Sequence, residues 1–175
     1  MDCDTAQAMK KFREPPREAR LTYPVVPATM SQVHGNLWMG GWPPPSWKLG
    51  RHFDCLVLCA LEYQIPGCFR DIQVIQAKLN DNGTPMRREE AFEATRAAKQ
   101  VIQWLKQDLR VLVTCFAGRN RSGLVCGLAL CRGPAAMNPA QAIRSIRAAR
   151  GEAALSNPWF LKLLMDLGQA EHSGT

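Results

Sequence analysis

The sequence predicts an α/β fold in which a central, mostly parallel sheet is flanked by helices. Short, continuous apolar runs at residues 53–59 and 111–114 are typical of strands buried on both faces, as parallel strands are. Segments with a helical period of apolar residues lie between and after these runs. With 175 residues, of which 46% are hydrophobic and 21% charged, the chain is long enough for one domain with a full core.

The first half of the chain predicts further elements around the strand at 53–59. A Gly35-Asn36 turn within residues 31–41 is followed by an apolar run. Residues 71–77 alternate between polar and apolar side chains and predict a strand, whereas 78–85 are a loop. Residues 87–108 predict a helix that leads into the strand at 111–114, and its expected core-facing residues are Ala91, Phe92, Thr95, Ala98, Val101, Ile102 and Leu105.

Three helices are predicted after the strand at 111–114. The apolar run 124–130 indicates a buried helix, and Gly133-Pro134 ends it. Asn138-Pro139 is a good cap and first helical position for a second helix that reaches Arg150. Ser156-Asn157-Pro158 starts the last helix, which continues through Leu167.

The ends of the chain differ in composition from the middle. We divide the sequence into a polar, basic N-terminal tail (1–22), a domain (23–170) and a C-terminal tail (171–175). The basic tail is interpreted as loosely held, and the alternative is an anion-binding arm. The proline segment 42–47 is expected to pack its tryptophans on the domain, and the alternative is a ligand-stacking surface.

Charge and cysteine content restrict the class of protein. The net charge of +7 favours anionic partners such as phosphoproteins, inositol lipids, nucleotides or RNA. Seven cysteines without a regular framework indicate a reducing compartment, and no Cys/His spacing resembles a zinc site. The N-terminus does not resemble a signal peptide, and no apolar stretch approaches the roughly 20 residues of a membrane span. We therefore expect a cytoplasmic protein with no membrane span.

The segment that carries chemistry is the loop 115–121, between the strand at 111–114 and the buried helix. Its sequence is Cys115-Phe-Ala-Gly-Arg-Asn-Arg121, followed by Ser122. A curled loop at a helix N-terminus directs several N–H groups at one point, and the helix dipole adds positive potential there. Such a site, with a nearby arginine, favours the thiolate form of a cysteine. Arg121 can bind two oxygens of a phosphate at once, and Ser122 can donate a hydrogen bond to the thiolate.

Cys-x5-Arg-Ser in this context resembles the phosphate-binding loop of cysteine-dependent protein tyrosine phosphatases, and the chain length and flanks resemble the small dual-specificity branch. Residues 31–41 are similar to the first hairpin of that branch. The resemblance implies a phosphatase that forms a phosphocysteine and needs no metal or cofactor. It implies that Cys115, Arg121 and Ser122 are catalytic and that the loop binds substrate through Phe116, Ala117, Gly118, Arg119, Asn120 and Arg121. We call residues 115–121 the phosphate loop.

Asp81 is the candidate general acid. A carboxylic acid on a mobile loop beside the cysteine could protonate the leaving oxygen. Asp81 follows a strand and lies in an Asn/Gly/Pro loop ahead of the helix 87–108, where the family carries its acid. Asp54 and Asp71 lie at strand starts and are placed worse. The alternative for Asp81 is an ordinary turn aspartate, because Asn-Asp-Asn-Gly is turn chemistry.

Two residues leave the function of the site open. The family usually has histidine before the nucleophile, where this chain has Thr114, so a weakly active phosphate-binding module is one alternative. Arg119 adds a second cation to the loop. Inositol-lipid phosphatases carry a lysine at a similar place, and RNA 5′-triphosphatases of the superfamily have a similar Asn-Arg-[Ser/Thr]-Gly ending. A non-protein substrate is therefore the other alternative. The leading expectation is a phosphoprotein substrate, from which the enzyme removes phosphate at phosphotyrosine and at phosphoserine or phosphothreonine.

Cys59 ends the strand at 53–59. A cysteine at a similar place in some lipid-directed members of the family forms a reversible disulfide with the nucleophile. The simpler interpretation is that Cys59 is a small buried core residue.

Overall fold

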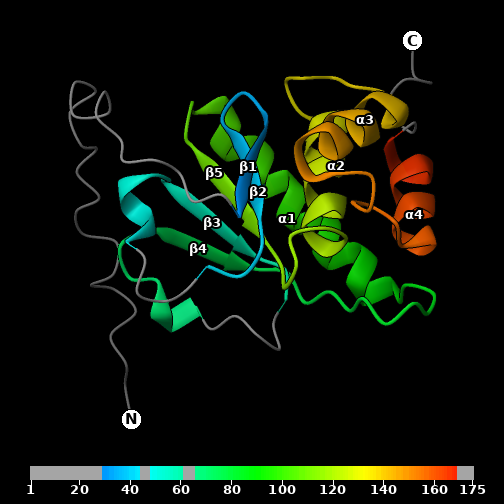
Figure 1. The fold of residues 1–175 in the computed structure, drawn as a ribbon, viewed down its shortest axis with the longest axis horizontal. Coiled ribbons are helices and arrows are strands. Elements are labelled where there is room, and N and C mark those ends of the chain that lie inside the picture. The colour runs from blue at the N-terminus through cyan, green and yellow to red at the C-terminus, as the bar shows by residue number, and fades with distance from the viewer. Residues whose placement is uncertain (1–28, 44–47, 61–65, 169–175) are drawn as a thin grey trace.

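The structure is a computed structural model, and it describes residues 29–43, 48–60 and 66–168 (Figure 1). The predicted tails at 1–22 and 171–175 lie outside these residues, as does most of the proline segment. The described residues form strands β1 (Met30–His34), β2 (Leu37–Gly40), β3 (Cys55–Leu58), β4 (Gln73–Gln76) and β5 (Val111–Thr114), and helices α1 (Arg88–Lys106), α2 (Arg121–Arg132), α3 (Pro139–Arg150) and α4 (Pro158–Gly168).

The five strands form one sheet in the order β1-β2-β5-β3-β4. β1 and β2 are an antiparallel hairpin around Gly35-Asn36, and every other pair of neighbours is parallel. β5 is the central strand, and its last residue, Thr114, is in register with Gly40 of β2 and with Leu58 of β3. The chain therefore leaves the sheet at Cys115 between two neighbouring strand ends. The predicted α/β fold with a mostly parallel sheet is confirmed.

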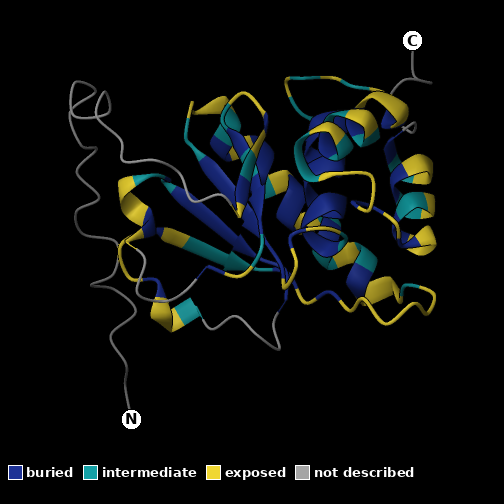
Figure 2. Cartoon of the chain, in the orientation of Figure 1, coloured by how far each residue is buried: buried dark blue, intermediate teal, exposed yellow. Residues whose placement is uncertain are grey.

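Each face of the sheet is covered by apolar side chains. One face packs against the helices, through residues such as Val57 and Val113, and this is the larger core. The other face carries Leu56, Leu58 and Leu112, which pack with residues of the connections beside β3 and β4. β3 and β5 are buried along their whole length, as the continuous apolar runs predict (Figure 2).

α2 is the helix around which the other three are arranged (Figure 1). Residues 121–131 of this helix are all buried, because α1, α3 and α4 pack on it and it also lies against β2 and β5. α3 starts at Pro139 with the predicted cap: the Asn138 side chain accepts a hydrogen bond from the Gln141 N–H at 2.9 Å. None of the described helices has both the length and the apolar character needed to cross a membrane.

The core-facing side of α1 differs from the predicted one. Ala98, Val101 and Ile102 are buried as expected, but Phe92 is 66% exposed. The buried side also includes Ala94, Ala97 and Trp104, which the prediction left out. The physical reason is the packing of α1 on α2 and β5, which decides the side of the helix that is buried, and the alanines on that side allow a close approach.

Candidate active site

The phosphate loop joins the end of β5 to the first turn of α2. The Cys115 N–H donates to the Gly40 carbonyl at 3.3 Å, so the loop starts against the end of β2. Gly118 has φ +64°, and a Cβ atom there would lie 2.4 Å from the carbonyl carbon of Gly40. Only glycine combines this left-handed conformation with this approach to another backbone. Gly118 thus allows the curl that the sequence predicts.

Four successive carbonyl groups of the phosphate loop, at residues 116–119, are held by partners outside it. Two of them accept from a single guanidinium on the last turn of α3. Arg150 donates from Nε to the Gly118 oxygen at 3.0 Å and from Nη2 to the Ala117 oxygen at 3.3 Å. It also donates from Nη1 to the Thr29 oxygen at 2.9 Å and to Ser31 Oγ at 3.3 Å. Arg150 therefore ties the loop to α3 and to the start of β1.

The flanking carbonyls are held by backbone N–H groups. Trp42 donates to the Phe116 oxygen at 3.1 Å, and Leu155 donates to the Arg119 oxygen at 3.4 Å. In a planar trans peptide the C=O and the following N–H point in opposite directions. The N–H groups of residues 117–120 consequently point away from these partners, as an anion held inside the loop requires.

The thiol and the arginine lie at the two ends of this loop. Cys115 is 3% exposed, and its Sγ lies 3.2 Å from Ser122 Oγ at hydrogen-bond distance. Arg121 is 6% exposed and is the first residue of α2. Its Nη1 donates to the Leu79 carbonyl at 3.4 Å, which links the loop to the segment that carries Asp81. The first turn of α2 thus supplies a hydroxyl to the thiol at one end of the loop and a buried guanidinium at the other end.

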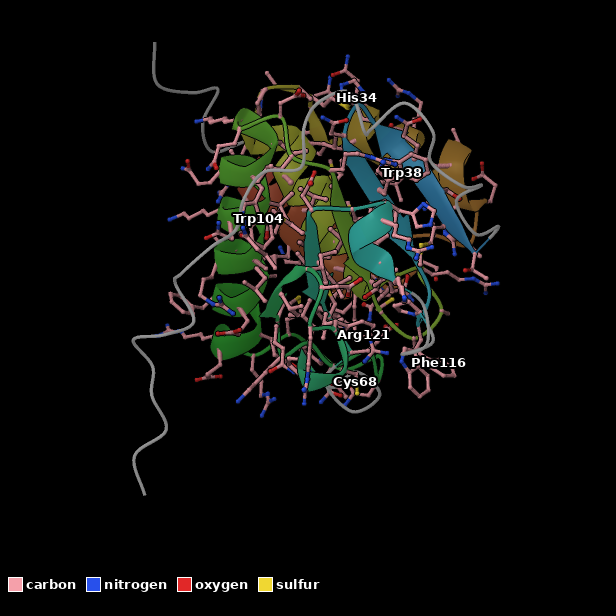
Figure 3. All side chains as sticks on the ribbon, turned by 90° about the vertical axis from the view of Figure 1, so that its left-hand side faces the viewer. His34, Trp38, Cys68, Trp104, Phe116 and Arg121 are labelled. Carbon is pink, nitrogen blue, oxygen red and sulfur yellow. The ribbon has the colours of Figure 1, made fainter. Side chains whose placement is uncertain are left out.

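Figure 3 shows where the site lies in the molecule. Arg121 and Phe116 are at the same end of the sheet, and His34 is at the opposite end. His34 is exposed at that opposite end, away from the phosphate loop. Phe116 is 52% exposed at the outer side of the phosphate loop. Arg119 is also exposed there, so it is free of the packing that surrounds Arg121.

Asp81 lies on an exposed segment, residues 80–84, which we call the acid loop. Its carboxylate accepts hydrogen bonds from two side-chain amides. Asn120 Nδ2 of the phosphate loop donates to Oδ2 at 3.1 Å, and Asn157 Nδ2 donates to Oδ1 at 2.8 Å. The structure therefore places Asp81 beside the phosphate loop, although the two are separated by more than thirty residues of sequence.

A buried carboxylate at the start of α1 holds the base of the acid loop. Glu90 is 5% exposed and accepts from the Asn80 N–H at 3.2 Å and from the Arg87 N–H at 2.9 Å. The other side of the loop is held by Trp159, whose indole Nε1 donates to the Gly83 oxygen at 3.1 Å. The acid loop is consequently attached to α1 and to the start of α4.

Thr114, where the family usually has histidine, is fully buried in β5. Its Oγ1 donates to the Val57 carbonyl at 3.1 Å, across to β3. The hydroxyl therefore stabilises the contact between the two strands that end at the site. It supplies no cationic group beside Cys115, since a hydroxyl is neutral.

Two buried thiols lie near Cys115. Burial raises the pKa of Cys59 well above its usual range, and the neighbouring Cys115 acts in the same direction. Burial likewise raises the pKa of Cys126, again with a contribution from Cys115. Within the described ranges, no three histidine, cysteine or acidic side chains come together in a way that could hold a metal ion.

The sequence predicts one site for Cys115, Arg121, Ser122 and Asp81, and the structure brings the segments that carry them together. No local pattern in the sequence points to Arg150, Glu90, Asn157 or Trp159 as parts of the site. Asn157 has the pattern of a helix start, and that signal says nothing about what its amide nitrogen contacts. Asn120 was predicted to bind substrate, and its side chain is bonded to Asp81 and to the Ser156 N–H. Its own N–H follows the Arg119 carbonyl, which is held outward by Leu155, so this N–H points to the inside of the loop.

Comparison with known proteins gives matches in structure but not in sequence. No family model matches the chain, and no curated protein matches it. The crystal structure of human DUSP28 is 20% identical with a TM-score of 0.71, over 86% of this chain and 99% of that one. A mouse putative dual specificity phosphatase complexed with zinc tungstate is 18% identical with a TM-score of 0.70, over 87% and 94%.

A third similar structure is PTPMT1 in complex with PI(5)P. It is 13% identical with a TM-score of 0.70, over 83% of this chain and 97% of that one. All three similar structures match nearly the whole of their own length. The chain therefore has the fold of the dual-specificity phosphatases of the protein tyrosine phosphatase superfamily.

Proposed function

We propose that the protein is a cysteine-dependent phosphatase that hydrolyses phosphate monoesters on proteins, at phosphotyrosine and at phosphoserine or phosphothreonine. The observation that carries the proposal is the phosphate loop itself. A buried cysteine and a buried arginine lie at its two ends, and the carbonyls between them are held outward. A tetrahedral dianion fits between the inward N–H groups and the guanidinium.

In the first step, the Cys115 thiolate attacks phosphorus and the bond to the leaving oxygen breaks. Arg121 and the loop N–H groups hold the equatorial oxygens, whose charge they stabilise in the transition state. Asp81 donates its proton to the leaving oxygen. The products of this step are the free hydroxyl of the substrate and a phosphocysteine on Cys115.

In the second step, water attacks the phosphocysteine and the S–P bond breaks. Asp81 is now a carboxylate and takes the proton from the water. Ser122 donates a hydrogen bond to the departing Cys115 thiolate, and the 3.2 Å between Sγ and Oγ supports this role. The thiolate and the protonated Asp81 are restored at the end of the cycle.

Arg119 is the observation that favours a second candidate function, a phosphatase on a multiply charged, non-protein substrate. Its side chain is exposed at the edge of the phosphate loop, where it can meet a further anionic group of the substrate. An inositol phosphate and an RNA 5′-triphosphate both carry such groups. PTPMT1, one of the structures of similar fold, was crystallised with PI(5)P.

A third candidate, a phosphate-binding module with little turnover, follows from Thr114. The experiment that separates binding from turnover compares the wild type with Cys115→Ser and Arg121→Lys. We expect the wild type to hydrolyse p-nitrophenyl phosphate. The Cys115→Ser variant should lose turnover but should still bind tungstate, as measured by calorimetry. Arg121→Lys should lose most activity, because lysine cannot make the bidentate contact. If the wild type binds tungstate but does not hydrolyse p-nitrophenyl phosphate, the protein is a phosphate-binding module instead.

The substrate class is tested with a panel measured at equal phosphate concentration. It contains phosphotyrosine and phosphothreonine peptides, inositol phosphates and triphosphate-ended RNA. The proposal expects the highest kcat/KM on the peptides. In the Arg119→Ala variant, a selective loss on inositol phosphates or RNA would favour the second candidate.

A further inference from the structure

The Asp81 carboxylate lies in a clamp formed by two amides that can only donate to it. Asn157 Nδ2 is 2.8 Å from Oδ1, and Asn120 Nδ2 is 3.1 Å from Oδ2. An amide side chain could in principle turn its oxygen toward Asp81 instead. What decides the orientation is the set of contacts on the other side of each amide.

The orientation of the Asn157 amide is determined by helix α4. Its Oδ1 accepts from the Trp159 N–H at 2.9 Å and from the Phe160 N–H at 3.4 Å, so Asn157 is the cap of that helix. With Oδ1 occupied by the helix N–H groups, Nδ2 must face the other way. The cap thus converts the start of α4 into a fixed hydrogen-bond donor aimed at Asp81.

The Asn120 amide is oriented in the same manner by the residues before α4. Its Oδ1 accepts from the Ser156 N–H at 2.8 Å and from Ser156 Oγ at 3.3 Å. The two amides therefore act as one unit, and the chain between α3 and α4 fixes both. Of the two, Asn157 is the better-held donor, because it is 6% exposed and caps a helix whose Phe160 is buried in the core.

We propose that Asn157 is a positioning residue for the reaction, which holds the carboxyl group of Asp81 over the phosphate loop through an amide whose direction is set by the cap of α4. The proposal rests on the function proposed above. An ionised carboxylate has about four lone-pair sites, and the two amides occupy one on each oxygen. The remaining sites can carry the proton that is transferred to the leaving oxygen. The acid is thus aligned before substrate arrives, which removes part of the entropy cost of the step.

Asn157→Ser tests the proposal, because serine keeps the capping oxygen but lacks the amide N–H that reaches Asp81. The matched control is Asn138→Ser, which makes the same change at the cap of α3, at the opposite end of that helix from Arg150 and the phosphate loop. The readout is kcat/KM on aryl phosphates that differ in the acidity of the leaving phenol. General acid catalysis contributes about 10²–10⁴-fold, and it matters most for poor leaving groups.

For phenyl phosphate we expect Asn157→Ser to lose about tenfold to a hundredfold in kcat/KM, since small misplacements of a catalytic group have effects of this size. For 2,4-dinitrophenyl phosphate, whose phenolate leaves without a proton, the loss should be no more than about threefold by the same reasoning. In an Asp81→Asn background, Asn157→Ser should have no further effect. Asn138→Ser should leave kcat/KM unchanged for phenyl phosphate, for 2,4-dinitrophenyl phosphate and in the Asp81→Asn background.

Equal losses for all leaving groups, or losses that add to those of Asp81→Asn, would show that Asn157 serves only α4 and would overturn the proposal. A readout independent of turnover separates this failure from failure of the proposed function. Amide hydrogen exchange of residues 80–84 should accelerate in Asn157→Ser, while residues 161–164 of α4 remain protected. If the wild type hydrolyses nothing, the proposed function and the catalytic role of Asn157 both fail, even where hydrogen exchange shows the clamp.

Discussion

Arg150 Nε donates a hydrogen bond to the carbonyl oxygen of Gly118 at 3.0 Å, across more than thirty residues of sequence. The same guanidinium binds the Ala117 carbonyl, so one side chain of α3 sets the direction of two peptides in the phosphate loop. Burial lowers the pKa of Arg150, and the nearby charge of Arg119 acts in the same direction. A lysine could not replace these contacts, because only the planar fork of arginine matches several acceptors at once.

Arg150→Ala should therefore disorganise the phosphate loop. Hydrogen bonds to a charged group contribute about 1.5–3 kcal/mol, so the free energy of unfolding should fall by at least that amount. Tungstate affinity should decrease together with kcat/KM for p-nitrophenyl phosphate. The control is Arg144→Ala, an exposed arginine of the same helix. If the two variants bind tungstate equally well, Arg150 does not shape the loop.

Gly118→Ala should be far more destabilising than Gly35→Ala. Both glycines have positive φ, +64° and +49°, so an alanine is strained at either by about 1–2 kcal/mol. Nothing lies within 4 Å of a Cβ atom at Gly35, whereas at Gly118 it would meet the backbone of Gly40 and Gly41. The clash should add about 1–3 kcal/mol, measured by urea unfolding. Equal destabilisation at the two positions would contradict the close approach of the loop to β2.

Asp81→Asn should lower kcat strongly for phenyl phosphate, by about 10²–10⁴-fold, because asparagine has no proton to give to the leaving oxygen. Esters of more acidic phenols should be affected less. Asparagine keeps the size of the side chain and leaves the phosphate loop intact, so tungstate affinity should not change. A loss that is the same for every leaving group would mean that Asp81 is structural and that another acid is needed.

Thr114→His tests whether the missing imidazole reduces the reactivity of Cys115. A histidine beside Cys115 should increase the thiolate fraction at mildly acidic pH, which is read as faster alkylation by iodoacetate. It also replaces a fully buried hydroxyl that bonds to Val57, so stability should fall by about 1–3 kcal/mol. Unchanged or slower alkylation would count against the idea that Thr114 weakens thiolate stabilisation.

Cys59 should form a disulfide with Cys115 when the protein is treated with mild peroxide. Leu58 and Thr114 are in register, and the Cys59 N–H donates to the Thr114 oxygen at 2.8 Å. Cys59 and Cys115 are therefore the first residues after the ends of two adjacent strands. Neighbouring strands are about 4.8 Å apart, within the range that a disulfide bridges. Peroxide oxidises Cys115 to the sulfenic acid, and the Cys59 thiolate then displaces hydroxide from that sulfur.

The rate of this bond formation should rise with pH. Burial raises the pKa of Cys59, so at neutral pH the thiol is protonated and its thiolate is scarce, and the attacking species becomes more abundant as the pH increases. Peptide mapping identifies the linked pair. Cys59→Ser should proceed to irreversible oxidation, and Cys126→Ser, which removes the other nearby buried thiol, should still recover with dithiothreitol. Equal recovery of Cys59→Ser and the wild type would leave Cys59 as a core residue only.

The features of this protein that can be predicted without the structure depend on residues close together along the chain. The apolar run at 111–114 is a strand with those bounds, because a strand buried on both faces needs apolar side chains without interruption. Asn138-Pro139 starts α3, because capping depends on residues within one turn. Cys115, Arg121 and Ser122 meet because one short loop and the first turn of a helix contain all three.

Contacts between segments far apart in sequence could not be predicted in this way, because the packing of the helices and strands sets them. Arg150 looks like any other basic residue of α3 until the packing of α3 brings it to the phosphate loop. Asn157 has the pattern of a helix cap, and the packing of α4 beside the acid loop directs its amide to Asp81. Phe92 fits the apolar period of α1, and it is exposed because neighbouring elements select which side of a helix is buried. Local patterns carry no information on such choices, since the energy that decides them comes from packing across the whole core.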